Sequence, residues 1–507
     1  MHQGTEDVCT LRPACAEDEE IVYRWRNLPE IIELGLSRCA VGEEEHRIWF
    51  GETLRAVDRE LFIIEVRGQA AGAVRYDFDM FGQAEISIYL VPPYAGHGFG
   101  TQVLAQSLPE TFVKRRVNTI RATVRKGNER SLAFFRSLGF RDSETDPLSH
   151  TLVLEHPQVP HSRPWIDDQE IAAVVSVLNS RQLSQGPRVA ELERLWCKVT
   201  QCRAAAAVGT GLGALRLALV ALGVRPGSEV ILPGYSCVAL ANAVLAIGGT
   251  PVCADVEVDS WTLSADDVQC KLTKRTKAII AVHLFGYPAD MQRLAAFEVP
   301  LIEDCAHGVG GTTDGTPFGS NAQLSVSSFY ATKMLCSGEG GIVASQHEDL
   351  IDLIIQSRDY SDQGASAFHL NDKLTDIQAA LAIAQLQKLD EILHRRQARA
   401  QRYHRLLTGL VEKGLIALPL DIPGRIWYRY PIRLKQHLAG RTSERMRAFG
   451  VSAELPVRDW RQRGSCDTHL PATMEAFERI LSLPLYPDLS ELEQRLVVSS
   501  LYSSLTS

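Results

Sequence analysis

The segment Leu324–Lys333 reads LSVSSFYATK, and the glycine cluster Gly338-Glu339-Gly340-Gly341 follows it. Its apolar part, Leu324–Phe329, predicts a short buried β-strand that ends just before a lysine. The glycines allow the backbone to come close to whatever that lysine holds. A desolvated lysine amine is a nucleophile that forms Schiff bases with carbonyl compounds or pyridoxal phosphate (PLP). A solvated lysine at a strand end is the alternative, so other segments must decide between the two.

Further short apolar runs alternate with helical patterns around this strand. The alternation predicts an α/β fold with a mainly parallel sheet whose two faces are covered by helices. Ligands of such sheets bind beyond the carboxyl ends of the strands. The predicted strands are Ala205–Val208, Glu229–Leu232, Pro251–Ala254, Ala278–Leu284, Leu301–Asp304 and Leu324–Phe329.

A glycine-rich turn, Gly209–Gly213, follows the first of these strands and opens a helix. A dinucleotide-binding fingerprint is one interpretation, but it requires an acidic residue at the end of the next strand. Glu229 stands at the start of that strand instead of its end, so the dinucleotide interpretation fails. A helix N-terminus that binds a single phosphate remains possible.

Asp304 ends another predicted strand, in the sequence Ile302-Glu303-Asp304-Cys305-Ala306-His307. A carboxylate at this place can keep a pyridine nitrogen protonated, which makes PLP an electron sink. An ordinary aspartate that caps a turn is the alternative. The order of phosphate site, Asp304 and Lys333 along the chain favours a PLP site.

From Arg163 to Leu501 the chain resembles the DegT/DnrJ/EryC1/StrS family of fold-type I PLP enzymes, chiefly sugar aminotransferases. The resemblance implies a covalent bond between Lys333 and PLP, pairing of Asp304 with the ring nitrogen, and a position for His307 near the ring. It also implies a homodimer in which Asn371 of one subunit reaches the phosphate bound by the other. The motifs that match are Ser162-Arg163-Pro164, Leu183–Pro187, His283–Met291, Glu303–His307, the lysine segment, Asn371–Ala380 and Leu483–Pro487. The cofactor-binding residues implied in this way are Gly211, Leu212, Cys237, Asp304, His307, Ser328, Lys333 and Asn371.

Two positions and one segment depart from the family pattern. Leu212 replaces a usual threonine, so only its backbone N–H can bind phosphate, and Cys237 stands where an aromatic ring commonly stacks on the cofactor. The segment Val457–His469 does not match the family's substrate-binding segment. Lys333 is retained, whereas dehydratase-type members lose this lysine, and its presence favours transamination.

The N-terminal part of the chain has a different pattern. Strands are predicted at Glu60–Val66, Ala71–Tyr76 and Glu85–Val91, and the glycine-rich stretch Pro92–Thr101 leads from the last strand into a helix. Backbone N–H groups and the positive end of the helix dipole suit a pyrophosphate at such a place. A plain tight turn is as compatible with the spacing.

Together with Asn128–Ser131 and Leu138-Gly139-Phe140, this stretch resembles the GNAT family of acetyl-CoA-dependent N-acetyltransferases. Trp25–Asn27 and Glu45–Phe50 are similar to the branch that acetylates amino sugars on nucleotide carriers. The resemblance implies that Asn128 lies along the pantetheine arm of acetyl-CoA. The residues that it implies for binding the pyrophosphate are Gly96, His97, Gly98, Phe99, Gly100 and Thr101.

This part also departs from its family. Ala95 replaces a frequent arginine or glutamine, and Phe135 replaces a frequent tyrosine, so no general acid is assigned. The candidates for the base that takes a proton from the attacking ammonium are Glu85, which we select, and His46. Glu85 as a surface carboxylate and His46 as a residue at a helix start are the structural alternatives.

The composition limits the class of protein. The 507 residues predict two or three domains, which we place at residues 1–155, a linker at 156–163, and residues 164–507 with a small C-terminal part from about 395. Hydrophobic residues at 45% and charged residues at 22% are typical of a soluble globular protein. The net charge of -8 offers no surface for nucleic acid, so small molecules and other proteins are the expected partners.

One apolar run, Ala204–Val224, approaches the length that spans a bilayer. It contains Arg216 and four glycines, so a buried strand, turn and helix is expected instead. Met1–Glu20 lacks the pattern of a secretory signal. The 11 cysteines form no C-x-x-C pair and no zinc-like cluster. We therefore expect reduced cysteines, no metal site, no membrane insertion and a cytoplasmic location.

The sequence predicts a two-step enzyme. Its C-terminal domain would transfer an amino group from glutamate to a nucleotide-linked keto sugar, expected to be a 4-keto-6-deoxy sugar. Its N-terminal domain would acetylate the new amine with acetyl-CoA. One alternative is an active aminotransferase with a GNAT-like module for binding or assembly. A non-catalytic sensor is the other alternative, and the presence of Lys333, Asp304 and Ser328 speaks against it.

Overall fold

The computed structural model describes residues 9–361, 369–436, 438–460 and 469–506. The chain divides into two compact units, which we describe separately. The N-terminal unit comprises Met1–Val159 together with Met446–Val451 and Ser490–Ser507, and the C-terminal unit comprises Pro160–Arg445 and Ser452–Leu489. The division at Val159 and Pro160 lies within the segment that we expected to be a linker.

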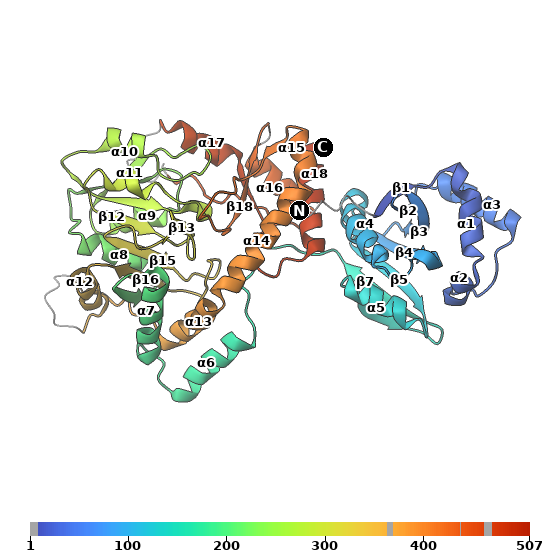
Figure 1. The fold of residues 1–507 in the computed structure, drawn as a ribbon, viewed down its shortest axis with the longest axis horizontal. Coiled ribbons are helices and arrows are strands. Elements are labelled where there is room, and N and C mark those ends of the chain that lie inside the picture. Colours follow the sequence, from blue (N-terminus) through green and yellow to red (C-terminus); the bar gives the residue numbers. More distant parts are fainter. Residues whose placement is uncertain (1–8, 362–368, 437, 461–468, 507) are drawn as a thin grey trace. The chain divides into compact units, whose positions relative to one another are not determined.

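The N-terminal unit is built on a seven-stranded sheet in the order β1-β2-β3-β4-β5-β7-β6 (Figure 1). β4 and β5 run parallel, and their pairing covers only Gln83–Glu85 of β4. The two strands therefore stop pairing beyond Glu85, while β4 continues to Leu90. The strands are β1 (Cys9–Pro13), β2 (Arg59–Val66), β3 (Gln69–Phe78), β4 (Gln83–Leu90), β5 (Thr119–Arg125), β6 (Arg141–Thr145) and β7 (Ser149–Glu155).

Helices cover this sheet, and one of them comes from the far end of the sequence. The C-terminal helix α18 packs along α4, and its Leu496, Val497 and Leu501 are buried. The sequence analysis placed these residues with the C-terminal domain. The helices of this unit are α1 (Glu19–Arg26), α2 (Pro29–Leu34), α3 (Glu43–Arg55), α4 (Phe99–Arg115), α5 (Glu129–Ser137) and α18 (Glu491–Thr506).

The C-terminal unit contains a second seven-stranded sheet, in the order β10-β9-β11-β12-β15-β16-β8. Every strand predicted for this sheet is present within one or two residues. The sequence analysis missed β16 (Gly341–Ser345), which lies antiparallel between β15 and β8. The other strands are β8 (Ala204–Val208), β9 (Glu229–Pro233), β10 (Thr250–Ala254), β11 (Thr276–Val282), β12 (Leu301–Asp304) and β15 (Leu324–Ser328). The predicted α/β class is confirmed for both units.

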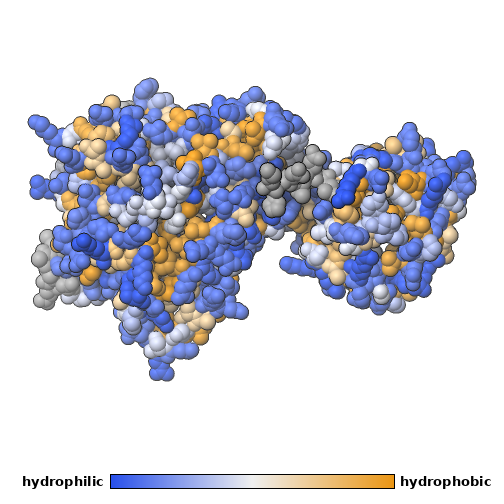
Figure 2. Space-filling view, viewed as in Figure 1, coloured by the Kyte–Doolittle hydropathy of each residue, from blue (hydrophilic) through white to orange (hydrophobic). Residues whose placement is uncertain are grey.

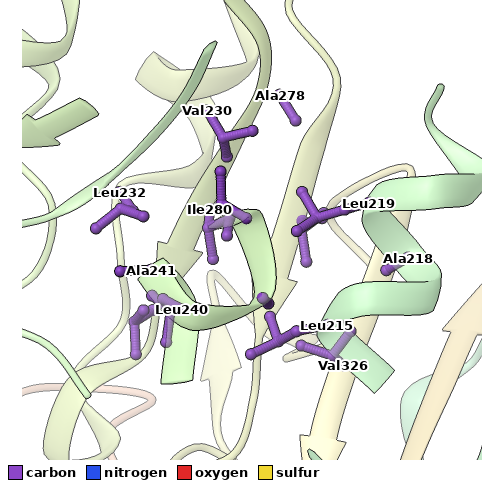
Figure 3. Close-up of a cluster of buried hydrophobic side chains, with 14 of the residues drawn as sticks. Leu215, Ala218, Leu219, Val230, Leu232, Leu240, Ala241, Ala278, Ile280 and Val326 are labelled. Carbon is purple, nitrogen blue, oxygen red and sulfur yellow. The ribbon is translucent and has the colours of Figure 1, made fainter. Parts of the chain in front are cut away.

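Alternation along the strands places apolar side chains on both faces of the sheet. Val230 and Leu232 point to the same face as Ile280, where they pack with α8 and α9 (Figure 3). Ile231 and Ile279 belong to a cluster on the other face. Two buried faces explain why these strands are continuous apolar runs in the sequence.

Helices and a smaller sheet complete the C-terminal unit. The smaller sheet has the order β17-β18-β19 and consists of β17 (Ile416–Ala417), β18 (Tyr430–Leu434) and β19 (Ile480–Leu483). β13 (Thr312–Thr313) and β14 (Thr316–Pro317) form a short hairpin. The helices up to β16 are α6 (Asp168–Ser180), α7 (Pro187–Thr200), α8 (Gly211–Ala221), α9 (Ala239–Ala246), α10 (Ala265–Lys271) and α11 (Met291–Ala295). The later helices are α12 (Glu348–Arg358), α13 (Asp376–Gln387), α14 (Leu389–Leu406), α15 (Thr408–Glu412), α16 (Ala439–Arg447) and α17 (Pro471–Arg479).

Two expectations about the chain as a whole have clear outcomes. The apolar run Ala204–Val224 forms β8, a turn and α8, as predicted, and within the described ranges no helix is long and apolar enough to span a membrane. The expectation that all cysteines are reduced is wrong at Cys253 on β10, which is disulfide-bonded. Spacing along the sequence did not reveal that bond, because it depends on the tertiary fold.

Candidate active sites

The lysine segment lies at the carboxyl end of the large sheet. β12 ends at Asp304 and the neighbouring β15 ends at Ser328, so these side chains emerge at the same edge. The glycine cluster pairs with the segment between Ser328 and Lys333, because the Phe329 amide donates to the Gly340 carbonyl at 2.9 Å. The glycine cluster therefore lies beside the lysine segment, and its approach to a group held by Lys333 stays a prediction.

Asp304, the predicted partner of a pyridine nitrogen, is buried at the end of β12. Its carboxylate is 4% exposed, and its Oδ1 accepts a hydrogen bond from the Ala306 amide at 2.9 Å. Its Oδ2 has no hydrogen-bond partner among the described residues, so it is available to a ligand. Burial raises the pKa of Asp304, and the Ala306 amide and the Lys333 charge act against that rise. A cationic ring nitrogen would compensate the buried carboxylate.

The residues predicted to bind phosphate lie where α8 begins. Thr210 caps the helix, and its Oγ1 accepts a hydrogen bond from the Gly213 amide at 2.9 Å. A Cβ atom on Gly211 would lie 2.7 Å from the Ser328 Cβ, so only glycine allows this approach. The helix N-terminus and the Ser328 hydroxyl thus face the same space, which fits a phosphate. The Leu212 side chain is 43% exposed.

His307 lies against a tyrosine that the sequence analysis did not assign to the site. The rings of His307 and Tyr428 stack with centroids 4.2 Å apart, and the Lys333 Nζ lies 5.5 Å from the Tyr428 centroid. Burial and the Lys333 charge lower the pKa of His307 well below its usual value, so the imidazole is neutral at pH 7. Burial by itself would raise the pKa of Tyr428, but the charges of Arg429 and Lys333 lower it to about 8. The ring of Tyr428 thus holds His307 in place beside Lys333.

Two residues of the predicted set are exposed in the single chain. Cys237 is exposed beyond the end of β9, and Asn371 is exposed as well. The segment that follows Asn371 contacts the start of α8, because the Asp372 carbonyl accepts from the Gly209 amide at 2.7 Å. The roles of Cys237 and Asn371 stay predictions. Most of the unmatched segment Val457–His469, residues 461–468, lies outside the described residues.

A second buried polar cluster contains His283, Glu303 and Cys305. The His283 Nε2 lies 2.8 Å from a Glu303 carboxylate oxygen, and the His283 Nδ1 accepts from the Ala289 amide at 3.0 Å. The other Glu303 oxygen accepts from the Asn321 amide at 2.9 Å. Because these hydrogen bonds occupy both ring nitrogens, the cluster connects strand ends and loops rather than offering free metal ligands.

The N-terminal unit has its own ligand-binding geometry between β4 and α4. Gly96 and Gly98 have φ angles of +91° and +83°, and Gly98 directly precedes α4. Gly100 is buried, and a Cβ atom there would lie 3.2 Å from the Phe134 ring. The loop Gly96–Thr101 therefore needs its glycines, and it directs the first amides of α4 to a common point. Beyond Glu85 the backbone of β4 is no longer paired with β5.

Arg130 adds a positive charge that the sequence analysis missed. A Cβ atom on Gly96 would lie 3.1 Å from its Nη2, so the guanidinium lies against the loop. Asn128 caps α5, and its Oδ1 accepts from the Ser131 amide at 3.1 Å. That contact explains the local role of Asn128 and leaves its amide nitrogen for other partners.

The acid and base candidates of this unit occupy different environments. Glu85 is exposed on β4 and accepts from the Thr123 hydroxyl at 3.0 Å. His46 is buried among aromatic rings, its Nε2 lies 3.2 Å from the Glu19 carbonyl, and its Nδ1 has no partner in the described part of the chain. Burial lowers the pKa of His46. Phe135 packs against Phe140 in the core and has no acidic proton.

Comparison with known families identifies a family for each part of the chain. Residues 164–502 match the DegT/DnrJ/EryC1/StrS aminotransferase family, and residues 9–141 match the acetyltransferase (GNAT) domain. Both resemblances and their order along the chain are confirmed.

Solved structures resemble the larger part of the chain. The aminotransferase TlmJ from Streptoalloteichus hindustanus is 30% identical, covers 68% of this chain and 98% of its own length, and has a TM-score of 0.64. NtdA from Bacillus subtilis with bound cofactor PMP is 27% identical, with coverage of 70% and 87% and a TM-score of 0.63. The PLP form of Spr1654 from Streptococcus pneumoniae, described as a sugar aminotransferase, is 25% identical, with coverage of 69% and 98% and a TM-score of 0.63.

Proposed function

The chain belongs to the DegT/DnrJ/EryC1/StrS aminotransferase family, and from this premise we propose that it aminates a nucleotide-linked keto sugar and then acetylates the product. Its aminotransferase cofactor is PLP, and its GNAT domain uses acetyl-CoA. The proposed amino donor is glutamate, and the proposed acceptor is a 4-keto-6-deoxy sugar. The observation that carries the proposal is that one chain joins a site that makes amines to a domain that acetylates them.

The residues of the C-terminal unit fit PLP and its chemistry. Asp304 would pair with the ring nitrogen, and the N-terminus of α8 with Ser328 would hold the phosphate. Bound PLP supplies the electron sink for amino transfer. Lys333 would hold the cofactor covalently, and its amine would move the proton at the carbon that gains or loses nitrogen. The neutral His307, stacked on Tyr428, would contact the cofactor ring.

The N-terminal unit would act on the amine that results. The loop Gly96–Thr101 and Arg130 would bind the pyrophosphate of acetyl-CoA, and Asn128 would lie along its pantetheine arm. The thioester would lie along the part of β4 that no longer pairs with β5. Glu85, on β4 at the start of that part, would take the proton from the attacking ammonium.

We also propose a homodimer. Exposed apolar side chains lie on α6, where Ile171, Val175 and Leu178 are each about half exposed, at 56%, 46% and 49%. Figure 2 shows hydrophobic side chains on the surface over this part of the C-terminal unit. A second subunit would cover such a surface and bring Asn371 to the neighbouring phosphate site. The exposure of Asn371 in the single chain supports this arrangement.

The test is a product assay on the purified chain with PLP. UDP- and dTDP-linked 4-keto-6-deoxy sugars are incubated with glutamate, with and without acetyl-CoA. The products are identified by mass spectrometry. We expect an amino sugar without acetyl-CoA and an N-acetylated sugar with it.

Two other outcomes of this assay would lead to different conclusions. An amino sugar that stays unacetylated, together with no calorimetric binding of acetyl-CoA, would support a non-catalytic GNAT module. The absence of any amine from every keto sugar would end the proposal for transamination of this substrate class.

A further inference from the structure

Two arginine side chains in the N-terminal unit approach the same aromatic ring. The guanidinium carbon of Arg26, on α1, lies 4.6 Å from the centroid of the Trp49 ring, and that of Arg75, on β3, lies 5.8 Å from it. The Arg26 guanidinium forms no hydrogen bond or ion pair with any residue in the described ranges. Arg75 donates from its Nε to Asp77 at 2.8 Å. Two cationic side chains therefore meet at Trp49, and among the described residues only Arg75 has a carboxylate partner.

The charges around these arginines are unbalanced. Asp77 is shared, because it also accepts from the Arg59 Nε at 2.6 Å. Arg26 is partly buried, and burial lowers its pKa, an effect that the neighbouring Arg75 charge reinforces and that Tyr89 and the Glu45 carboxylate oppose. Like charges that are partly withdrawn from water repel one another more strongly than in solution. An anion placed between Arg26 and Arg75 would remove this repulsion.

A buried hydroxyl faces the same region. Tyr89 lies on β4 beyond Glu85, in the part that no longer pairs with β5. Its hydroxyl is buried and has no hydrogen-bond partner among the described residues, and the charges of Arg26 and Arg75 both act on it. A buried hydroxyl without a hydrogen-bond partner destabilises the fold. A ligand oxygen could accept this hydrogen bond.

We propose that Arg26, Arg75 and Tyr89 bind the phosphate groups of the acetyl acceptor, with Trp49 as the surface that orients both guanidiniums. Planar guanidiniums bind phosphate through paired hydrogen bonds, and two of them suit a diphosphate ester. The inference rests on the proposed function, because the acceptor is then a nucleotide-linked amino sugar. The phosphates of acetyl-CoA are a second possible source of the anion, although Arg130 and the loop Gly96–Thr101 already serve them.

Protection from chemical modification tests this site residue by residue. The full chain is treated with phenylglyoxal, which modifies accessible arginines, and the modification rate of each arginine is followed by peptide mass spectrometry. UDP, inorganic pyrophosphate, uridine and CoA are added separately. Arg24 is the matched control, because it lies on the same helix, is exposed and pairs only with Glu20 on the surface. Peptide resolution separates this site from any nucleotide site in the C-terminal unit.

We expect UDP and pyrophosphate to slow the modification of Arg26 and Arg75 at least threefold, uridine to have no effect, and Arg24 to react at a constant rate. Equal rates with and without UDP and pyrophosphate would overturn the proposal and leave a packing role for the arginines. Protection by CoA alone would also overturn it, because the anion would then belong to the cosubstrate.

A kinetic measurement distinguishes the failure of this inference from the failure of the proposed function. Acetyl transfer to the amino sugar without protection of Arg26 would preserve the function and reject the site. Protection without acetyl transfer would preserve the site and reject the function. If both hold, Arg26→Gln should raise the KM for the nucleotide-linked amine about tenfold with little change in kcat, while Arg24→Gln leaves both unchanged.

Discussion

The two ligand-binding regions of this chain use different parts of the polypeptide. In the C-terminal unit, side chains from several strand ends converge, with the Asp304 carboxylate, the Ser328 hydroxyl and the Lys333 amine near one edge of the sheet. In the N-terminal unit, the loop Gly96–Thr101 offers mainly backbone amides. A site built from side chains requires specific residue types, which can be recognised in a sequence. A site built from backbone amides requires only glycines. The first site was therefore easier to define from the sequence than the second.

The strongest test of this contrast removes the nucleophile. Lys333→Ala should lower transamination by at least about 10³-fold and abolish the visible absorption of the bound cofactor, because no other described amine replaces it. Acetylation of a supplied amino sugar should be unaffected. Lys274→Ala, at an exposed position, is the control. Unchanged absorption in Lys333→Ala would refute the role of Lys333.

A smaller loss is expected from neutralising the buried carboxylate. Asp304→Asn keeps the size of the side chain but cannot stabilise a protonated ring nitrogen, so transamination should fall on the order of 10²-fold. Steady-state kinetics with glutamate measures the change. Asp314→Asn, on an exposed turn, should have no effect. A wild-type rate for Asp304→Asn would show that the ring nitrogen is not paired with this residue.

In the N-terminal unit, the corresponding change concerns the backbone. Gly98→Ala places a Cβ atom at φ +83°, which costs roughly 1–2 kcal/mol and should raise the KM for acetyl-CoA about tenfold. Gly68→Ala is matched, because Gly68 has φ +73° in the turn between β2 and β3 and no atom within 4 Å of the added Cβ. Gly68→Ala should lower the free energy of unfolding and leave the KM for acetyl-CoA unchanged. Equal KM values for acetyl-CoA in the two variants would show that the loop does not bind acetyl-CoA.

The smallest effect concerns the titration of Tyr428. Because Arg429 and Lys333 lower its pKa to about 8, the apoprotein should show phenolate absorption near 295 nm as the pH rises through about 8. The folded-state pKa is lower than the usual value of about 10, so this group adds stability that is complete above pH 10 and lost as the pH falls through 8. Tyr428→Phe should lack both effects, whereas Tyr502→Phe, at an exposed tyrosine, should keep them. A wild-type absorption curve in Tyr428→Phe would contradict the assignment.

Most of the C-terminal fold followed from local patterns. The apolar runs predicted six of the strands of the large sheet because strands buried on both faces carry apolar residues throughout. β16 was missed, since Gly341–Ser345 follows the glycine cluster and its pairing depends on β8, which lies far away in the sequence. The same limitation applies to α18, whose place beside α4 depends on contacts across almost 400 residues.

Within the sites, residues with distinctive chemistry were found and supporting residues were not. Asp304 and Lys333 were found because carboxylates and amines stand out at strand ends. Tyr428 and Arg130 were missed, because an aromatic or basic residue at such positions is common in any sequence. Nothing in the local pattern of Trp49 indicated that two arginines approach its ring.

By itself, the sequence determined the α/β class of both units and the two families, and it predicted the nucleophile, the carboxylate and the glycine-rich turns. These features are local, because a strand, a helix start or a positive φ depends on a few neighbouring residues. The tertiary structure alone decided that Tyr428 supports His307, that Arg26 and Arg75 share Trp49, and that α18 joins the N-terminal unit. Each of these depends on packing between segments distant in sequence, where many residue types are compatible with the same local structure.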